Sequence, residues 1–199
     1  MQKIKLTKHE LKRHKENLRR YNRFLPTLTA KKQQLQREIV RIRGEIKGLE
    51  STFKEERAGI MPWVSLLAED VGLEKMVRCK GIRLGADNIA GVDIPGFEGV
   101  DLAVTDYDLL STPLWVDWAI EKLGRLMVLD ARIDVLKKQI ALLAQELLVT
   151  TQRVNLFEKV KIPEAIDAIR RIAIHLGDQQ TAAVVWAKMA KKKLQVQGI

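Results

Sequence analysis

The chain has 199 residues, of which 46% are hydrophobic and 5% aromatic, and its formal net charge is +10. So few aromatic side chains favour narrow aliphatic seams over a wide globular core. The single cysteine, Cys79, excludes an intrachain disulfide. The N-terminus lacks the apolar run of a signal peptide. No segment reaches the roughly 18 uninterrupted apolar residues of a membrane-crossing helix. We therefore expect a cytoplasmic protein without direct membrane insertion.

Charge is unevenly distributed along the chain. Residues 1–60 have a net charge of +10, residues 61–118 a net charge of −6, and residues 119–199 a net charge of +6. Summed charge steers a protein toward complementary surfaces without setting its fold. The pattern therefore predicts different partners for the basic ends and for the acidic middle.

The first predicted segment, residues 1–60, is an N-terminal coiled-coil arm. From Leu11 onward apolar residues recur in alternating steps of three and four, and only His14 and Lys32 interrupt them. A sustained period of about 3.5 residues keeps one seam of a helix facing its partner. The predicted seam residues of this arm are Leu18, Leu25, Leu35, Ile39, Ile42 and Ile46.

The ends of this arm also have sequence signals. Thr7 is a predicted N-cap, with Glu10 three residues later as its capping-box partner. Pro26 predicts a kink or a short break inside the helix, because proline removes one backbone hydrogen bond. Gly59 and Pro62 predict its end.

The second predicted segment, residues 61–112, is a small irregular head or foot. Residues 76–80 and 89–94 are predicted strands of a β-hairpin, with the turn chemistry of residues 85–88 between them. The hairpin could simply pack on itself. We favour a partner contact through Val92, Ile94, Pro95 and Phe97, because the segment is too small to bury their side chains well.

The third predicted segment, residues 113–199, is a C-terminal coiled-coil arm, with Thr112 as its N-cap and Pro113 as its first helical residue. Thr150 is the only polar residue in its main seam. The predicted seam residues here are Ile133, Leu136, Ile140, Leu143, Leu147 and Val154. Beyond them the same spacing continues with smaller side chains through Ile162, Ile166, Ile169, Ala173 and Leu176.

Together the segments predict an all-α fold. Its main feature is a long antiparallel two-helix coiled coil formed by the N- and C-terminal arms, and a small middle region contains the β-hairpin. Such a molecule is strongly elongated, and its second arm overhangs the first. A lone overhanging helix is marginal in water, so we expect partner subunits to enclose the C-terminal tip.

The residue types that commonly bind metals or catalyse reactions do not occur in the spacing of a metal site or an active site. His9, His14 and His175 have no metal-ligand spacing with one another or with Cys79. Neither a phosphate-binding glycine loop nor a pair of catalytic carboxylates is present in the sequence. We therefore expect no catalytic residue, no metal and no cofactor. Lys191, Lys192 and Lys193 form either a solvated tail or a loose electrostatic contact with a partner.

Three motifs in chain order carry a resemblance to a known family. They are LPTL at residues 25–28 followed by KKQQL at residues 31–35, NIAGVDIPGF at residues 88–97, and RVNLFEKVKIP at residues 153–163. In these motifs the chain resembles the D subunits of the V/A-type rotary ATPases, also called V-type ATP synthases, and its first motif is similar to the bacterial branch.

The resemblance implies a non-catalytic central-stalk rotor shaft that couples ATP turnover to ion transport. It implies a hexameric ring of catalytic and regulatory ATPase subunits around the terminal helices. A small F subunit would bind at the side, and a funnel-shaped socket subunit on the membrane ring would hold the middle region. The implied location is cytoplasmic and peripheral to the inner membrane.

Two other functions fit parts of the sequence. Basic residues crowd the first arm, at Lys12, Arg13, Lys15, Arg19, Arg20 and Arg23. They could bind nucleic acid, but they alternate with an intact seam and match no known recognition module, so we expect no nucleic-acid partner. The third possibility is a passive basic coiled-coil scaffold, which predicts self-association of the purified chain.

Overall fold

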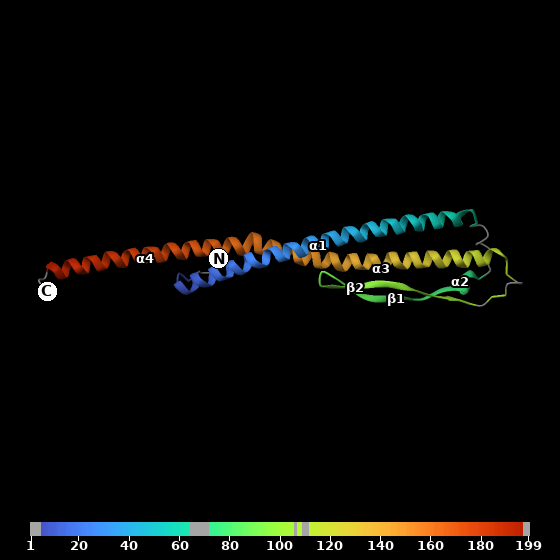
Figure 1. The fold of residues 1–199 in the computed structure, drawn as a ribbon, viewed down its shortest axis with the longest axis horizontal. Coiled ribbons are helices and arrows are strands. Elements are labelled where there is room, and N and C mark those ends of the chain that lie inside the picture. The colour runs from blue at the N-terminus through green and yellow to red at the C-terminus, as the bar shows by residue number, and fades with distance from the viewer. Residues whose placement is uncertain (1–4, 64–71, 106, 109–111, 197–199) are drawn as a thin grey trace. The chain divides into compact units, whose positions relative to one another are not determined.

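The computed structural model describes residues 5–63, 72–105, 107, 108 and 112–196, without the side chains of Glu74, Lys75, Leu194 and Val196. Parts of the predicted middle region, residues 64–71, 106 and 109–111, lie outside this description. In chain order the elements are helix α1 (Lys8–Ile60), a 3-10 turn η1 (Met61–Trp63), helix α2 (Leu73–Met76), strands β1 (Val77–Ile89) and β2 (Val92–Val104), helix α3 (Trp115–Leu156), a π-helix η3 (Phe157–Lys161) and helix α4 (Ile162–Val196) (Figure 1).

The predicted fold class is confirmed. Two long helical arms flank a two-stranded antiparallel hairpin in the chain. The arms run in opposite directions where ion pairs join them, because Glu45 pairs with Arg132 whereas Glu56, further along α1, pairs with Lys122, earlier in α3.

The chain forms two compact units, and both take residues from the two arms. Unit 1 consists of Met1–Lys31 and Thr150–Ile199, and unit 2 consists of Lys32–Val149. Helix α1 therefore contributes its first part to unit 1 and the rest to unit 2. The compact units do not follow the three predicted segments.

Helix α1 begins at its predicted cap. The Glu10 backbone N–H donates to Thr7 Oγ1 at 3.3 Å, which satisfies one of the unpaired donors of the first turn. The Glu10 carboxylate instead accepts from Arg13 at 3.3 Å. The helix passes Pro26 without the expected break, and the Thr29 hydroxyl close by donates to the Leu25 carbonyl oxygen.

The hairpin turn lies further along the chain than predicted. Ala90 and Gly91 form a two-residue connection, and both have positive φ, 54° and 76°. Residues 85–88, the predicted turn, belong to β1 and pair with residues 93–96 of β2. Positive φ at both central residues characterises the tight turns whose twist matches that of paired strands. Asn88 supports this turn, because its Oδ1 accepts from the Gly91 N–H at 3.0 Å.

The hairpin runs beside α3 (Figure 1). The prediction that it forms part of a head at the base of the helices was therefore wrong. Gln139 Nε2 donates to the Pro95 carbonyl oxygen at 2.6 Å, and Leu102 lies against Gly124. Pro95 and Leu102 are seven positions apart, which spans about 23 Å in a strand, and Gly124 and Gln139 are 15 positions apart, which spans a similar length of about 22 Å in a helix. Strand β2 and helix α3 therefore lie alongside one another in opposite directions.

Helix α3 begins later than predicted, at Trp115 instead of Pro113. Thr112 is not its N-cap, because its hydroxyl donates to the Asp108 carbonyl oxygen at 2.8 Å. Asp117, in the first turn of α3, accepts a hydrogen bond from the Tyr107 hydroxyl, which raises the pKa of Tyr107. This contact ties the chain before α3 to the positive end of the helix, where a carboxylate is favourable.

Candidate functional site

The predicted seam residues of unit 2 lie together in one buried cluster. Its members from α1 are Leu35, Ile39, Ile42 and Ile46, and its members from α3 are Ile133, Leu136 and Leu143. Leu35 and Leu143 are fully buried, and Ile140 and Leu147 are partly buried against the cluster. Each fully buried side chain of this size stabilises the pair by about 1.5–3 kcal/mol relative to its exposed state. Unit 2 is thus a continuous aliphatic zipper.

Ion pairs between the helices flank this zipper. Arg132 and Glu45 approach to 2.7 Å, and so do Lys122 and Glu56. The hydrogen bond from Lys122 is the main cause of a lowered pKa of Glu56. Burial opposes it, and the charges of Lys122 and Arg125 add to the lowering. Exposed pairs contribute little to stability but help to fix the register of the two helices.

The expected partner contact at the hairpin needs a correction. Ile94 is only 3% exposed and belongs to the buried cluster of the two helices, so the premise that its segment could not bury it was wrong. Val92 packs partly against the same cluster, and the Pro95 carbonyl oxygen is held by Gln139. Val92, Pro95 and Phe97 remain partly exposed.

Sequence reasoning missed a second buried row on α3. Gly124, Ala131, Val135 and Gln139 are buried although they lie outside the predicted seam. The row runs between the two points where the hairpin contacts α3, and its small and β-branched residues allow the strands to approach closely. Its members follow one another in steps of seven and four residues, which place them on one face of the helix, and this spacing was the signal that could have revealed a second packed face.

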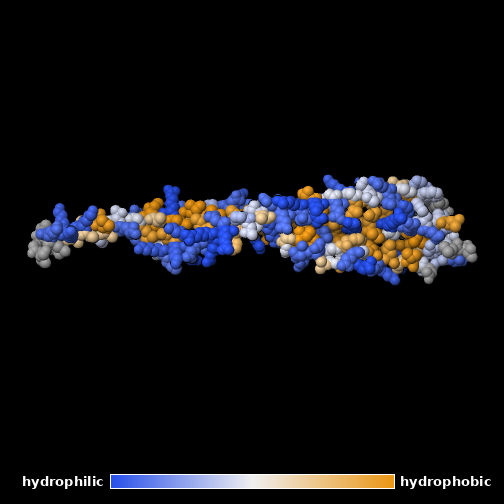
Figure 2. All heavy atoms as spheres, viewed as in Figure 1, coloured by the Kyte–Doolittle hydropathy of each residue, from blue (hydrophilic) through white to orange (hydrophobic). Residues whose placement is uncertain are grey.

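Unit 2 also has an apolar groove of about 620 Å³ beside the hairpin. Leu102 and Val104 of β2 and Ile120 and Val128 of α3 line it, and Glu56, Glu121 and Arg125 carry charge at its lining. In Figure 2, hydrophobic atoms reach the surface over this part of the chain.

The predicted seam continues into unit 1 only up to the π-helix. Val154 is buried, and Leu18 and Leu25 are partly buried. Tyr21 and Phe157 pack with their ring centroids 5.3 Å apart. The Ile162 N–H then bonds to the Phe157 carbonyl oxygen, five residues earlier, so that this turn contains one extra residue. Pro163 follows directly and has no N–H for a normal helical bond.

The extra residue changes which side chains of α4 are buried. Ala165, Ala168 and Ile172 are buried, whereas Ile166 is 52% exposed and Ala173 is exposed. The predicted continuation through Ile166, Ile169 and Ala173 was therefore wrong by one residue. A prediction from periodic spacing assumes that the same register continues along the helix, so it cannot detect the extra residue that a π-turn inserts.

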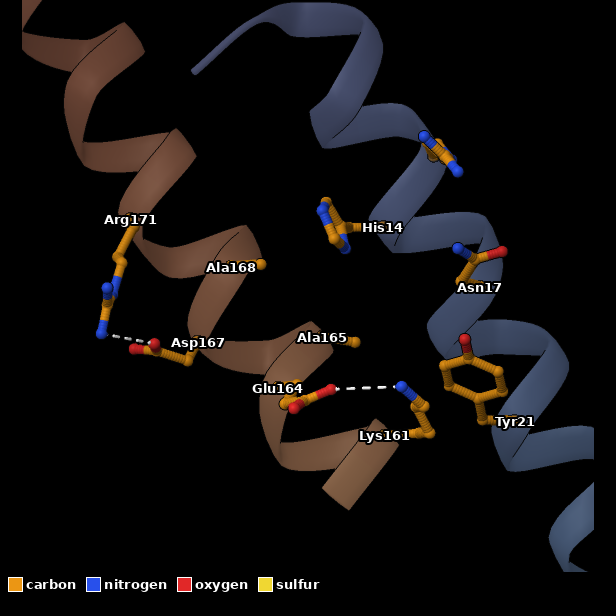
Figure 3. Close-up of a pocket in the computed structure, with 10 residues that line it drawn as sticks. His14, Asn17, Tyr21, Lys161, Glu164, Ala165, Asp167, Ala168 and Arg171 are labelled. Atoms are coloured by element: carbon orange, nitrogen blue, oxygen red, sulfur yellow. Dashed lines mark ion pairs between the residues drawn. The ribbon is translucent and has the colours of Figure 1, made fainter. Parts of the chain in front are cut away.

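A mostly polar cavity of about 690 Å³ accompanies this change in unit 1. In Figure 3, Ala165 and Ala168 of α4 point toward the helix that carries His14, Asn17 and Tyr21. Lys161 pairs with Glu164 at 3.5 Å, and Arg171 pairs with Asp167 at 2.8 Å (Figure 3). Small alanines opposite polar side chains leave this part of the helix pair loosely filled.

The last part of α4 lies exposed. Every described side chain from residue 177 to residue 193 is exposed, including Lys191, Lys192 and Lys193. Large apolar side chains occur among them, and Trp186 is 71% exposed. The others are Val184, Val185 and Met189. This end therefore presents apolar and basic side chains together.

Two histidines have identifiable neighbours in the described parts of the chain. His14 lines the cavity and lies 3.9 Å from Glu10, and His175 contacts Gln179. No group of three or more histidine, cysteine, aspartate and glutamate side chains is placed to hold a metal there. Among the same residues, no helix has both the length and the apolar character that crossing a bilayer demands.

Comparison with known proteins gives a consistent result. The family model described as the D subunit of ATP synthase matches residues 10–192. The V-type ATP synthase D subunit of Borreliella burgdorferi is 48% identical over 196 residues, which cover 98% of this chain and 96% of the relative. The protein of the same name from Chlamydia pneumoniae is 34% identical, over 97% of this chain and 94% of the relative. That from Chlamydia trachomatis serovar L2 is 32% identical, over 96% of each chain.

Proposed function

We propose that this chain, which belongs to the family of ATP synthase D subunits, is the central rotor shaft of a V-type rotary ATPase. Its family makes it a component of that complex, and the torque-transmitting role is our inference. The packed zipper of unit 2 carries the proposal, because its apolar residues from Leu35 to Phe53 lie against α3 and the hairpin lies beside α3. Dense packing resists relative movement of two helices.

The proposed mechanism uses the asymmetry of the shaft. A rod with different faces favours different conformations of the nucleotide sites around it, and turning the rod moves those preferences around the ring. ATP turnover and ion transport are then coupled by free energy carried through a rigid element. The chain itself catalyses nothing in this proposal.

We assign the proposed partners by surface chemistry. The hexameric ring of catalytic and regulatory subunits encloses the terminal helices of unit 1, where the exposed Trp186 and the lysines Lys191, Lys192 and Lys193 offer apolar and basic contacts. The funnel-shaped socket subunit on the membrane ring takes the end of unit 2, where Met61, Trp63 and Leu114 are exposed.

The small F subunit of the central stalk binds unit 2 at its side, where the apolar groove and the partly exposed Val92, Pro95 and Phe97 offer a surface. The assembled protein is cytoplasmic and peripheral to the inner membrane in this proposal. Ion translocation takes place in other subunits.

Affinity purification from native membranes tests membership and position together. A tagged chain is expected to bring down a nucleotide-binding hexamer and a membrane ring in fixed stoichiometry. Recovery of the chain alone, or as a self-associated oligomer, would instead support a passive scaffold.

The shaft role itself predicts uncoupling when the zipper is weakened. Ile39→Asn combined with Ile140→Asn places two amides in the seam of unit 2, where they disrupt the packing that transmits torque. ATP hydrolysis by the reconstituted complex is expected to continue, while ion transport per ATP falls several-fold in sealed vesicles.

The matched control is Val40→Asn with Leu142→Asn, which changes two exposed neighbours on the same helices. This control is expected to retain normal coupling. Equal coupling in both double variants would contradict the proposal that the zipper transmits torque.

A further inference from the structure

The π-helix leaves α4 with two apolar rows. The inner row, Ala165, Ala168 and Ile172, is buried. The second row, which we call the isoleucine stripe, consists of Ile162, Ile166 and Ile169 and continues through Ala173 and Leu176. Ile166 and Ala173 are exposed, and the other three are partly exposed. Figure 2 shows hydrophobic side chains at the surface along α4.

The isoleucine stripe lies away from the cavity of unit 1. Arg171 lines the cavity, and Ile169, two residues earlier, lies roughly 160° around the helix from it. Asn17 lines the cavity from α1. Lys15 and Arg19 are each two residues from Asn17, so they lie roughly 160° around α1 from it and also point away from the cavity. One side of unit 1 thus combines apolar residues of α4 with basic residues of α1.

The dimensions and charge of this surface define its occupant. From Ile162 to Leu176 the stripe extends about 21 Å, which matches a helix of about four turns. In α1 between Lys8 and Lys31 there are eight basic residues and two acidic ones. An apolar row with a basic edge complements a helix whose own apolar row is flanked by acidic residues.

We propose that the isoleucine stripe docks an acidic amphipathic helix from another protein, which adds a third helix to the pair in unit 1. That this helix comes from another subunit of the ATPase complex rests on the proposed function. The π-turn gives the stripe its outward direction, because one extra residue turns the alanine row toward α1 and leaves the isoleucines available.

Photocrosslinking in the intact complex tests the contact. Ile166→p-benzoylphenylalanine is introduced into the tagged chain, the complex is purified from native membranes and irradiated, and the linked peptide is sequenced. The expected product joins residue 166 to a helical segment of another subunit that has apolar residues in steps of three and four with acidic neighbours. Ile174→p-benzoylphenylalanine replaces an exposed isoleucine that lies about 120° around the helix from the centre of the stripe, and it is expected to yield at least about tenfold less of this product.

The outcomes separate this inference from the proposed function. If the chain copurifies with the complex but residues 166 and 174 give equal yields, the stripe does not dock a helix and the shaft role still stands. A product with a second copy of this chain, or with a segment that lacks acidic residues, also overturns the inference. Failure of the unsubstituted tagged chain to join the complex contradicts the proposed function instead.

A charge swap at one residue tests the acidic character of the occupant. Ile166→Glu and Ile166→Lys remove the same apolar contact from an exposed site, so circular dichroism should show both variants folded. Crosslinking is then measured from Ile169→p-benzoylphenylalanine in each background. We expect about tenfold less product with glutamate than with lysine, because only glutamate opposes an acidic helix. Equal losses would exclude an acidic occupant.

Discussion

Units 1 and 2 use the same pair of helices in different ways. In unit 2, large aliphatic residues such as Leu35 and Leu143 fill the seam, and the hairpin packs along α3. In unit 1, Ala165 and Ala168 face His14 and Asn17 beside a cavity of about 690 Å³. Full packing favours stiffness, whereas small residues opposite polar ones leave side chains free to adapt to a neighbour. By this comparison the helix pair is more densely packed in unit 2 and more loosely filled in unit 1.

The largest expected difference between the units lies in the cost of truncating a buried residue. Leu143→Ala in unit 2 should lower the free energy of unfolding by about 4 kcal/mol, because the dense cluster around it cannot collapse into the cavity. Ile172→Ala in unit 1 is equally buried but should cost only about 2 kcal/mol, because its surroundings are looser. Urea denaturation of the full chain, with exposed Leu148→Ala as the control, measures both values. Equal costs would remove the proposed difference in packing.

A smaller effect is expected where the hairpin is attached to α3 in unit 2. Gln139 is 8% exposed and donates to the Pro95 carbonyl oxygen, so Gln139→Leu leaves that oxygen without its donor. A loss of about 1–2 kcal/mol in the free energy of unfolding is expected. Hydrogen exchange should also accelerate in β2 while that of α4 stays unchanged. Equal acceleration of hydrogen exchange in β2 and α4 would show that the effect of losing this hydrogen bond is not confined to unit 2.

The register of unit 1 can be changed by removing one residue. Deleting Val160 from the π-helix should restore an ordinary helical turn and bring Ile166 and Ile169 to the positions that Ala165 and Ala168 occupy. With Cys79 replaced by serine, maleimide labelling compares Ala165→Cys with Ile166→Cys. Without the deletion, the thiol at position 166 should react about tenfold faster, because that position is exposed whereas position 165 is buried. In the deletion variant the order should reverse, and an unchanged order would mean that the π-turn does not set the register.

These differences also explain how far the sequence could predict the structure. The spacing of large apolar residues from Leu35 to Phe53 is regular, and the structure buries or partly buries them where the period places them. The π-turn has no such periodic signal, since only Pro163 hints at an irregular helix before it. Register beyond Phe157 therefore had to be seen in three dimensions.

The hairpin illustrates a second limit. Gly85, Asp87 and Asn88 have turn-forming character, but the turn requires positive φ at two adjacent residues, and Ala90 with Gly91 supplies it. Strand pairing beyond the predicted runs then extends each strand to 13 residues. Ile94 is buried through helix contacts distant in sequence, so its candidate role as a partner contact could not be judged from local composition.

The smallest expected effect concerns the ion pair of Glu56 with Lys122 in unit 2. Hydrogen bonding to Lys122 lowers the pKa of Glu56 below its usual 4.5, so the folded state favours the charged carboxylate. The resulting stabilisation is present above the unfolded pKa and is lost as the pH falls through the lower, folded-state pKa. Glu56→Gln should therefore be less stable than the unsubstituted chain near pH 7, and the two should converge in acid, at about pH 3.

The matched control for this ion pair is Glu55→Gln, because Glu55 accepts a hydrogen bond from Ser51 within its own helix. Urea denaturation across the pH range should show a pH-dependent difference for Glu56→Gln only. Salt at about 0.5 M should reduce that difference, since it screens partly exposed charges. A difference that persists unchanged in acid would mean that Glu56 stabilises unit 2 through packing of its side chain. The zipper alone would then have to hold the register of the two helices.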